Sequence, residues 1–352
     1  MFKSALCSGP RAVFALVAIL AQGLAACPPP ASAPEAGFAN GAASQPTAAP
    51  AHTVEGSAPG AADMQQPTAD EASTEPEATT PSDSAANAEA LTLGVWNMEW
   101  LAEADGAGYS PRTAPDYVRL AGYLPIIDAD VLVLQEVESL AAVRRVFNEQ
   151  DWNAYVVEQD SNQRVAVVWR KGVELNVLPD YDALNTANVR EGVDFVVTLP
   201  GESATAVRVL GVHLKSGCFS DDYRTADSDA CVKLATQVPV LEAWIDARAT
   251  EGVPYMVVGD FNRRLQPADP FWIELDDQQP AGADLEMTYG TARPQCWNSR
   301  YDQFVDHVVL GGPAISLLVP NSFREFVYPA ADAAFQEQLS DHCPLLVDLA
   351  TP

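Results

Sequence analysis

Residues 253–262 read VPYMVVGDFN, an apolar run that ends abruptly in a glycine and two polar side chains. Six further short apolar runs predict strands, at 91–96, 130–135, 165–169, 206–212, 305–310 and 344–349. Between them, helical periodicity covers 115–127, 140–147 and 229–247, although Pro239 is expected to kink or split the last helix. Strands that are apolar almost throughout have both faces covered. The pattern therefore predicts an α/β sandwich.

Polar side chains gather where the predicted strands end. They are Asn97, Glu99, Gln135, Glu136, His213, Asp260, Asn262, Asp306, Asp341 and His342. Because side chains at strand ends can converge on one rim of a sheet, we expect six separate segments to build a single polar pocket.

The chemistry of these side chains suits phosphate esters. Glu136, with Glu99 as a second carboxylate, offers the hard oxygen ligands that Mg²⁺ or Mn²⁺ prefers. Asp260 can take a proton from water while Asn262 donates a hydrogen bond to a phosphate, if the segment stays extended. Gly, Asp and Asn are also ordinary turn residues, so an Asx turn is the alternative at this position.

His342 needs a carboxylate partner from another segment, because Asp341 points the opposite way on a strand. Asp306 is the preferred partner, and Asp302 is the alternative. Such a pair raises the pKa of the imidazole, and a protonated His342 could stabilise a negatively charged transition state.

In order and approximate spacing, these motifs resemble the endonuclease/exonuclease/phosphatase superfamily. That superfamily includes deoxyribonuclease I, exonuclease III-type abasic endonucleases, bacterial neutral sphingomyelinases and inositol-polyphosphate 5-phosphatases. The motifs are Trp96–Glu99, Leu134–Val137, Val212–Leu214, Gly259–Asn262, Val305–His307 and Ser340–His342. The resemblance implies a four-layered α/β/β/α sandwich and divalent-metal-dependent cleavage of a phosphoester by an activated water.

The resemblance also implies a role for each residue. Glu136 would be the principal metal ligand, with Asn97 and Glu99 beside the metal and phosphate and Asp341 within reach of the metal. His213 would contact the phosphate. Asp260 would position or deprotonate the water, Asn262 would hold a phosphate oxygen, and Asp306 would orient His342.

The charge of the chain limits its substrates. It carries 20 basic and 48 acidic residues, a formal charge of −28, which excludes a protein that coats nucleic acid. Arg164, Lys215, Arg263 and Arg264 are candidate substrate-contacting cations, or else solvated surface charges. With no tract rich in Lys and Arg, we expect a small phosphoester, a nucleotide, a single-stranded nucleic acid or a lipid headgroup.

Two other functions remain open on the same fold. A sphingomyelinase-like phosphodiesterase would need exposed aromatic side chains to enter a membrane, for which the candidates are Phe219, Tyr223, Phe271, Trp272 and Trp297. A non-catalytic surface lipoprotein that binds other molecules would have lost its metal and water-activating residues, whereas this chain retains them. No protein partner is inferred. A zinc hydrolase is disfavoured because no His-x-x-x-His pattern occurs.

The N-terminal region predicts export. Residues 1–27 carry Lys3, Arg11 and an apolar run from Ala12 to Ala26, as a signal peptide does. The run ends in LAAC, typical of a lipoprotein, so Cys27 is the expected lipidation site and a membrane anchor in the periplasm or on the cell surface. Simple secretion is the alternative. Residues 28–90 contain 45 Ala, Pro, Ser, Thr or Gly among 63 and predict a disordered linker to a catalytic domain over 91–352.

Four cysteines in the predicted domain suit an oxidising compartment. Cys218, Cys231, Cys296 and Cys343 allow three pairings, of which Cys218 with Cys231 joins the nearest pair and leaves Cys296 with Cys343. A zinc site is the alternative, but no Cys-x-x-Cys occurs.

Overall fold

The computed structural model describes residues 90–201, 204–299 and 301–351. These ranges belong to one compact unit. The predicted signal peptide, its Cys27 and the predicted linker up to residue 89 lie outside them. Within the same ranges, no helix combines the length and apolar character that a membrane span requires.

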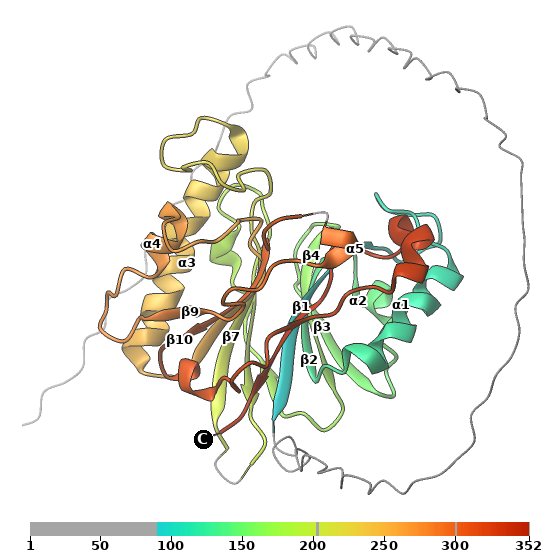
Figure 1. Ribbon diagram of the computed structural model, residues 1–352, viewed down its shortest axis with the longest axis horizontal. Helices are drawn as coiled ribbons and strands as arrows, with labels where there is room; N and C mark the ends of the chain where they lie inside the picture. The colour runs from blue at the N-terminus through green and yellow to red at the C-terminus, as the bar shows by residue number, and fades with distance from the viewer. Residues whose placement is uncertain (1–89, 202–203, 300, 352) are drawn as a thin grey trace, which may run out of the picture. The chain divides into compact units, whose positions relative to one another are not determined.

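Two mixed sheets of six strands form the centre of the described chain (Figure 1). The first sheet runs β11 (Arg324–Glu325), β12 (Leu345–Leu349), β1 (Leu91–Leu101), β2 (Val131–Val137), β4 (Arg164–Arg170) and β3 (Trp152–Val156). The second runs β5 (Leu175–Val177), β6 (Val193–Thr198), β7 (Ala206–His213), β8 (Tyr255–Asp260), β10 (Asp306–Gly311) and β9 (Leu285–Met287). Each sheet contains one parallel pair, β1 with β2 and β7 with β8.

Helices cover the outer face of each sheet. The first sheet is covered by α1 (Ala114–Ile127) and α2 (Leu140–Arg144), and the second by α3 (Asp229–Glu251) and α4 (Pro270–Leu275). Figure 1 shows these two pairs on opposite sides of the stacked sheets. The remaining helical segments are α5 (Cys296–Ser299), η1 (Asp182–Leu184), η2 (Gly312–Leu317) and η3 (Ala330–Gln338). The predicted four-layered α/β/β/α sandwich is confirmed.

The alternation of side chains along β1 shows why the layers form. Leu91, Leu93 and Val95 pack in the core between the two sheets. Trp96 and Met98 belong instead to the core under the first pair of helices. Because successive side chains of a strand point to opposite faces, an almost wholly apolar strand has to be covered on both sides.

Helix α3 is one continuous element, so Pro239 does not split it, which was one of the two outcomes predicted; the other, a kink, stays a prediction. The helix begins after Ser228, whose hydroxyl accepts a hydrogen bond from the backbone N–H of Cys231, and it ends at Gly252 in the left-handed conformation. A proline in a helix removes one backbone hydrogen bond. The buried face that includes Leu241 and Trp244 makes enough contact to hold the helix across that gap.

Five of the strands, β3, β5, β6, β9 and β11, escape sequence-based prediction. Three of these five have only two or three residues, too few for a periodic signal. Strand β6 carries Asp194 as its second residue, and a charged side chain there argues against a buried strand when the sequence is considered alone. The Asp194 carboxylate accepts hydrogen bonds from Arg208 (2.7 Å) and from Trp244 Nε1 (3.1 Å), so its burial is compensated.

The two sheets approach closely at Gly211 of β7. A Cβ atom there would lie 2.5 Å from Val193 Cγ1 and 2.7 Å from Cγ1 of Val133, which belongs to the facing sheet. We expect Gly211→Ala to lower the free energy of unfolding by about 1–3 kcal/mol through overpacking. Gly122 is exposed within α1 and has open space around it, so Gly122→Ala should raise that free energy by about 0.5–1 kcal/mol.

Urea denaturation of both variants measures these changes. Unaltered stability in Gly211→Ala would contradict the close packing of the sheets at this point.

Candidate active site

One edge of the sandwich collects the polar side chains at the strand ends. Asp260, the last residue of β8, lies opposite His213 of β7 on one side and Asp306 of β10 on the other. Asn97 reaches Asp260 from the first sheet, with Nδ2 donating to Oδ2 at 3.0 Å. His342 precedes β12 in the first sheet and contacts Asp306 in the second. Both sheets therefore contribute to one polar site.

His342 is paired with Asp306. Its Nδ1 lies 2.6 Å from Asp306 Oδ2, whereas Asp302 is exposed to solvent. Burial opposes charge on the imidazole, but the charge and hydrogen bond of Asp306 outweigh it and raise the pKa of His342 well above 6.5. The ring is therefore held protonated at neutral pH. The other oxygen of Asp306, Oδ1, is buried and has no hydrogen-bond partner among the described residues.

Asp260 is almost fully buried and is held by two donors. Besides Asn97, the backbone N–H of Asn262 donates to its Oδ1 at 2.7 Å. Burial, together with the nearby Asp306 carboxylate, raises the pKa of Asp260 to about 7. A carboxylate of this kind is poised to accept a proton near neutral pH.

The segment after Asp260 forms the Asx turn that the sequence allows, and it does not stay extended. Asn262 adopts φ = 51°, so the expectation of two side chains aligned along a strand is wrong. Its side-chain Nδ2 donates to the carbonyl oxygen of Leu214 at 3.2 Å, and Asn262 lines a cavity together with His342. The turn, rather than an extended strand, therefore places the Asn262 side-chain amide at the polar site.

Glu99 and Glu136 occupy irregular positions in neighbouring strands. Both have positive φ, 45° and 59°, and the β1–β2 and β2–β4 registers shift at these points. Such bulges redirect side chains at the edge of a sheet. Glu99 accepts hydrogen bonds from Ser110 Oγ and from the backbone N–H of Asp341, both at 2.9 Å. Burial, with the charge of Asp341, raises the pKa of Glu99.

His213 is buried beside two carboxylates. Its Nε2 lies 3.6 Å from Asp260 Oδ2 and 3.9 Å from Glu136 Oε1. Burial, with the positive charge of Arg190, holds the pKa of His213 well below 6.5, so the ring is neutral. Its side chain is only 2% exposed, as is that of Asp260, and the expected contact with a phosphate stays a prediction.

The donor set fits a hard divalent cation. Glu136, Glu99, Asp341 and Asn97 all offer oxygen atoms, which Mg²⁺ and Mn²⁺ prefer. Within the described ranges, the partly exposed Glu136 carboxylate makes no hydrogen bond, although His213 Nε2 lies 3.9 Å away and the charge of Arg190 acts on it. A negatively charged group left without a donor suits a metal ligand better than a structural residue.

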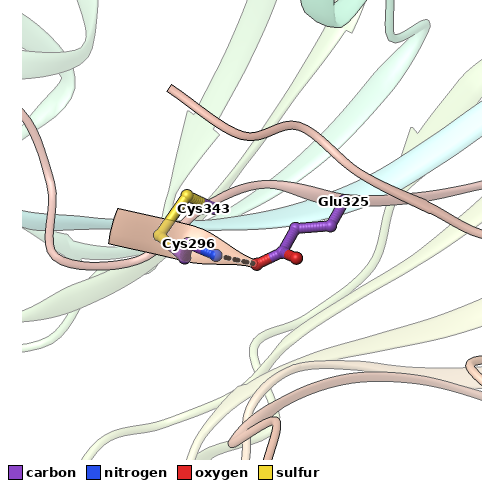
Figure 2. Close-up of side chains that lie close together, drawn as sticks. All are labelled: Cys296, Glu325 and Cys343. Carbon is purple, nitrogen blue, oxygen red and sulfur yellow. Dashed lines mark hydrogen bonds between the residues drawn. A yellow bond between two sulfur atoms is a disulfide. The ribbon is translucent and has the colours of Figure 1, made fainter. Parts of the chain in front are cut away.

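In the described chain, two groups of side chains have ligand atoms close enough together for a metal site, and Glu136, Glu99 and Asp341 do not form such a group. Neither of the two has the right chemistry. Asp260, Asp306 and His342 offer ligand atoms within 4.8 Å of one another, yet the His342 ring is protonated and already bound to Asp306. Cys296, Glu325 and Cys343 also lie together, as Figure 2 shows, but the two sulfur atoms are joined in a disulfide. The second disulfide joins Cys218 to Cys231. The zinc alternative for the cysteines is therefore wrong.

The segment that carries His342 is anchored on several sides. Ser340 Oγ donates to the carbonyl oxygen of Asn97 at 2.6 Å, and Trp297 Nε1 donates to the carbonyl oxygen of Ser340 at 2.8 Å. The ring of Trp297 stacks on Tyr328 at 4.7 Å. In Figure 2, the Cys343 disulfide ties the residue after His342 to α5.

Two arginines that support the site were not predicted from the sequence. The fully buried Arg112 donates to the carbonyl oxygens of Glu99 (2.8 Å) and Leu339, and so connects β1 to the segment before His342. Arg190 donates to the carbonyl oxygens of His213 (3.2 Å) and Leu214 (2.8 Å). Neither arginine stands in a recognisable motif, and only the folded chain brings them here.

Most of the proposed substrate-contacting cations have structural partners. Arg263 is fully buried and forms a two-pronged pair with Asp269, so its assignment to substrate contact is wrong. Arg164 Nε donates to the carbonyl oxygen of Gln159 at 2.6 Å, and Lys215 Nζ donates to that of Ser216 at 2.8 Å. Arg264 differs, because its side chain lines the same cavity as Asn262 and His342.

The aromatic side chains proposed to enter a membrane are mostly in the core. Tyr223, Phe271, Trp272 and Trp297 are all buried, and only Phe219 is exposed. These five residues therefore do not supply the exposed aromatic hairpin that a sphingomyelinase-like enzyme would need.

The chain matches one protein family and is similar in fold to several solved structures. The model of the Endonuclease/Exonuclease/phosphatase family matches residues 94–342. No curated protein sequence matches the chain. The human Nocturnin catalytic domain has a TM-score of 0.50 and 15% identity, over 74% of this chain and 93% of that one. A humanized D. rerio TDP2 has a TM-score of 0.51 and 17% identity, over 74% and 99%. D. rerio TDP2 complexed with single strand DNA product has a TM-score of 0.50 and 18% identity, with the same coverage.

The pairing of His342 with Asp306 predicts a change in titration. Asp306→Asn removes the largest of the charges that offset burial, so the pKa of His342 should fall below its wild-type value. NMR titration of the His342 ring in EDTA measures this directly. If protonated His342 is needed for turnover, the alkaline limb of the pH–rate profile should move to lower pH. An unchanged pKa would contradict the pairing.

The two disulfides provide a matched test of the anchoring of His342. They close loops with sequence separations of 47 and 13, so Cys296→Ser/Cys343→Ser should lose about 4 kcal/mol and Cys218→Ser/Cys231→Ser about 3 kcal/mol of stability. Only the first pair should also lower kcat, by about 10- to 100-fold, because it frees the segment next to His342. Equal kcat losses at a temperature where both variants are folded would argue against anchoring.

Proposed function

The chain belongs to the endonuclease/exonuclease/phosphatase family, a family of phosphoester hydrolases, and from that membership we propose an exported hydrolase that depends on Mg²⁺ or Mn²⁺. The observation that carries the proposal is the 2.6 Å contact between His342 and Asp306 beside the buried, proton-accepting Asp260. A protonated imidazole next to a carboxylate near neutral pKa provides an acid and a base in one site.

Glu136, Glu99, Asn97 and Asp341 are the residues that we propose to hold the metal ion. When bound, such an ion neutralises phosphate oxygens and lowers the pKa of water. The backbone bulges at Glu99 and Glu136 turn these two carboxylates, which come from adjacent strands, toward the polar edge.

Asp260 is the proposed base that takes a proton from the attacking water. Its pKa of about 7 places a useful fraction in the ionised form at neutral pH, while still allowing it to accept the proton. The donors from Asn97 and from the backbone of Asn262 fix the orientation of the carboxylate. Precise orientation lowers the entropy cost of the reaction.

His342 and the Asn262 amide are the proposed contacts to the phosphate. The transition state of phosphoester hydrolysis gains negative charge on the phosphate oxygens, and a fixed imidazolium stabilises that charge without reorganisation. Asp306 acts as a positioning residue that keeps the ring oriented and protonated. The neutral His213 separates the carboxylates of Glu136 and Asp260 without adding charge.

The cellular setting remains part of this proposal. The signal-like N-terminus and Cys27 support export with a lipid anchor that attaches the enzyme to a membrane in the periplasm or at the cell surface. Two disulfides agree with an oxidising compartment. The alternative of a sphingomyelinase-like enzyme loses support, because its proposed membrane-entering aromatics are buried. A non-catalytic binding protein would not require the buried acid and base found here.

Hydrolysis of bis-p-nitrophenyl phosphate tests the proposal. The full-length protein should be active with Mg²⁺ or Mn²⁺ and inactive in EDTA. We expect Asp260→Asn and His342→Ala each to lower kcat by about 100-fold or more, the size of effect that general acid–base catalysis provides. Supercoiled plasmid, single-stranded DNA and sphingomyelin extend the panel to other substrate classes.

Metal binding has a separate readout. Mn²⁺ should raise the melting temperature of the wild type, and Glu136→Gln should abolish that rise. Glu174→Gln is the matched control, since Glu174 is exposed and lies near the start of β1, away from Asn97. A folded wild type that neither binds Mn²⁺ nor cleaves any of these substrates would overturn the proposal in favour of a binding protein.

A further inference from the structure

A cavity of about 280 Å³ adjoins the catalytic pair and has two chemically different walls. Asn262, Asp306, Asp341 and His342 form the wall at which the reacting phosphate would lie. The other lining residues, called the second wall below, include Phe219, Arg264, Tyr301, Gln303, Glu325 and the Cys296–Cys343 disulfide. Nothing in the catalytic steps uses this second wall, so its residues are available to select the group attached to the phosphate.

Two aromatic rings stand at this second wall. Phe219 is 40% exposed and Tyr301 is 39% exposed, whereas most aromatic side chains of the described chain are buried. The backbone N–H of Arg264 donates to the carbonyl oxygen of Phe219 at 2.9 Å, which fixes the Phe219 loop beside the segment that carries Asn262. An exposed aromatic ring held at the mouth of a catalytic cavity is suited to stacking on a flat substrate group.

The polar side chains of the second wall suit the edges of such a flat group. Gln303 offers both a donor and an acceptor, and its side chain makes no hydrogen bond within the described ranges. Glu325 accepts hydrogen bonds from the backbone N–H groups of Gln295 (2.6 Å) and Cys296 (3.1 Å), as Figure 2 shows for Cys296. Its carboxylate is thereby fixed and retains lone pairs for an amino group.

The supply of positive charge limits how many phosphates the site can hold. Arg263 is buried against Asp269, while Arg164, Arg190 and Lys215 donate to backbone carbonyls. In the described chain, Arg264 is the arginine that lines the cavity, and its side chain makes no hydrogen bond there. Proteins that bind duplex DNA make several phosphate contacts with basic side chains. Among the described residues, one guanidinium without a side-chain hydrogen bond at the cavity fits a substrate with one or two phosphates.

We propose that this second wall binds a nucleoside, so that the substrate is a nucleoside phosphoester, either free or at the end of a single strand. The inference rests on the proposed function, since it needs the reacting phosphate to lie beside His342. The cavity is at the lower end of the range of small-molecule sites, about 300–1,000 Å³, which suits one nucleoside. Phe219 supplies the stacking surface, and Arg264 binds a neighbouring phosphate.

Two esters with the same leaving group separate the inference from the proposed function. Thymidine 5′-(p-nitrophenyl phosphate) carries a nucleoside, and methyl p-nitrophenyl phosphate does not. With the full-length protein and Mn²⁺, we expect kcat/KM to be about 5- to 100-fold higher for the thymidine ester, the range that one stacked base provides. Phe219→Ala should remove most of this preference by raising KM for the thymidine ester alone, and Phe219→Trp should retain it.

Matched variants and a binding measurement complete the test. Ile273→Ala removes another exposed apolar side chain, from α4, that does not line the cavity, and it should leave both esters unaffected. Arg264→Ala should weaken the binding of thymidine 5′-phosphate, measured by calorimetry, and Lys171→Ala should not. A thymidine-capped single strand of ten nucleotides compared with the free thymidine ester distinguishes the two sources of the nucleoside.

Each outcome has one meaning. Equal kcat/KM for the two esters, with no effect of Phe219→Ala, would overturn the nucleoside site and leave the hydrolase proposal standing. Faster cleavage of a duplex than of the corresponding single strand would also overturn it. Failure of the wild type to cleave either ester with Mg²⁺ or Mn²⁺ would instead contradict the proposed function. Loss of the thymidine preference in Phe219→Ala, with the methyl ester unchanged, supports the inference.

Discussion

The site depends on two side-chain hydrogen bonds that cross from one sheet to the other. Asn97 of the first sheet donates to Asp260 of the second at 3.0 Å, and His342, beside the first sheet, pairs with Asp306 of the second at 2.6 Å. Neither sheet alone contains both members of either pair. The distance between the sheets is therefore a constraint on function, and it is set in the apolar core, where Gly211 admits close packing.

A second constraint is the backbone geometry at the polar edge. Glu99, Glu136 and Asn262 all have positive φ, which costs energy for residues other than glycine. The surrounding contacts hold these conformations in place. Arg112 binds the carbonyl oxygen of Glu99, and the Asx turn closes over Asp260. Positive φ at three residues of the polar edge agrees with a site where side-chain direction matters more than local stability.

The electrostatics of the site fit an acidic protein that acts on an anion. The chain has a formal charge of −28, so the attraction for a phosphate has to be local. Three features can supply it: the protonated His342, the unpaired Arg264 of the described cavity, and a divalent cation held by Glu136 and its neighbours. Because so few positive groups are available at the described site, a small phosphoester is favoured over a long polyanion as the substrate.

The sequence by itself determined the strands with continuous apolar character, the burial of both faces of those strands, and the residue types at the polar edge. These are local properties, since an apolar run and a polar strand end are both visible in a few consecutive residues. Only the tertiary structure decided that Asp306 pairs with His342, that Arg263 is buried against Asp269, and that Arg112 and Trp297 support the site. The bulges at Glu99 and Glu136 also could not be predicted from the sequence. Each of these depends on contacts between segments far apart in the chain, and residue spacing carries no record of which distant partner a side chain will meet.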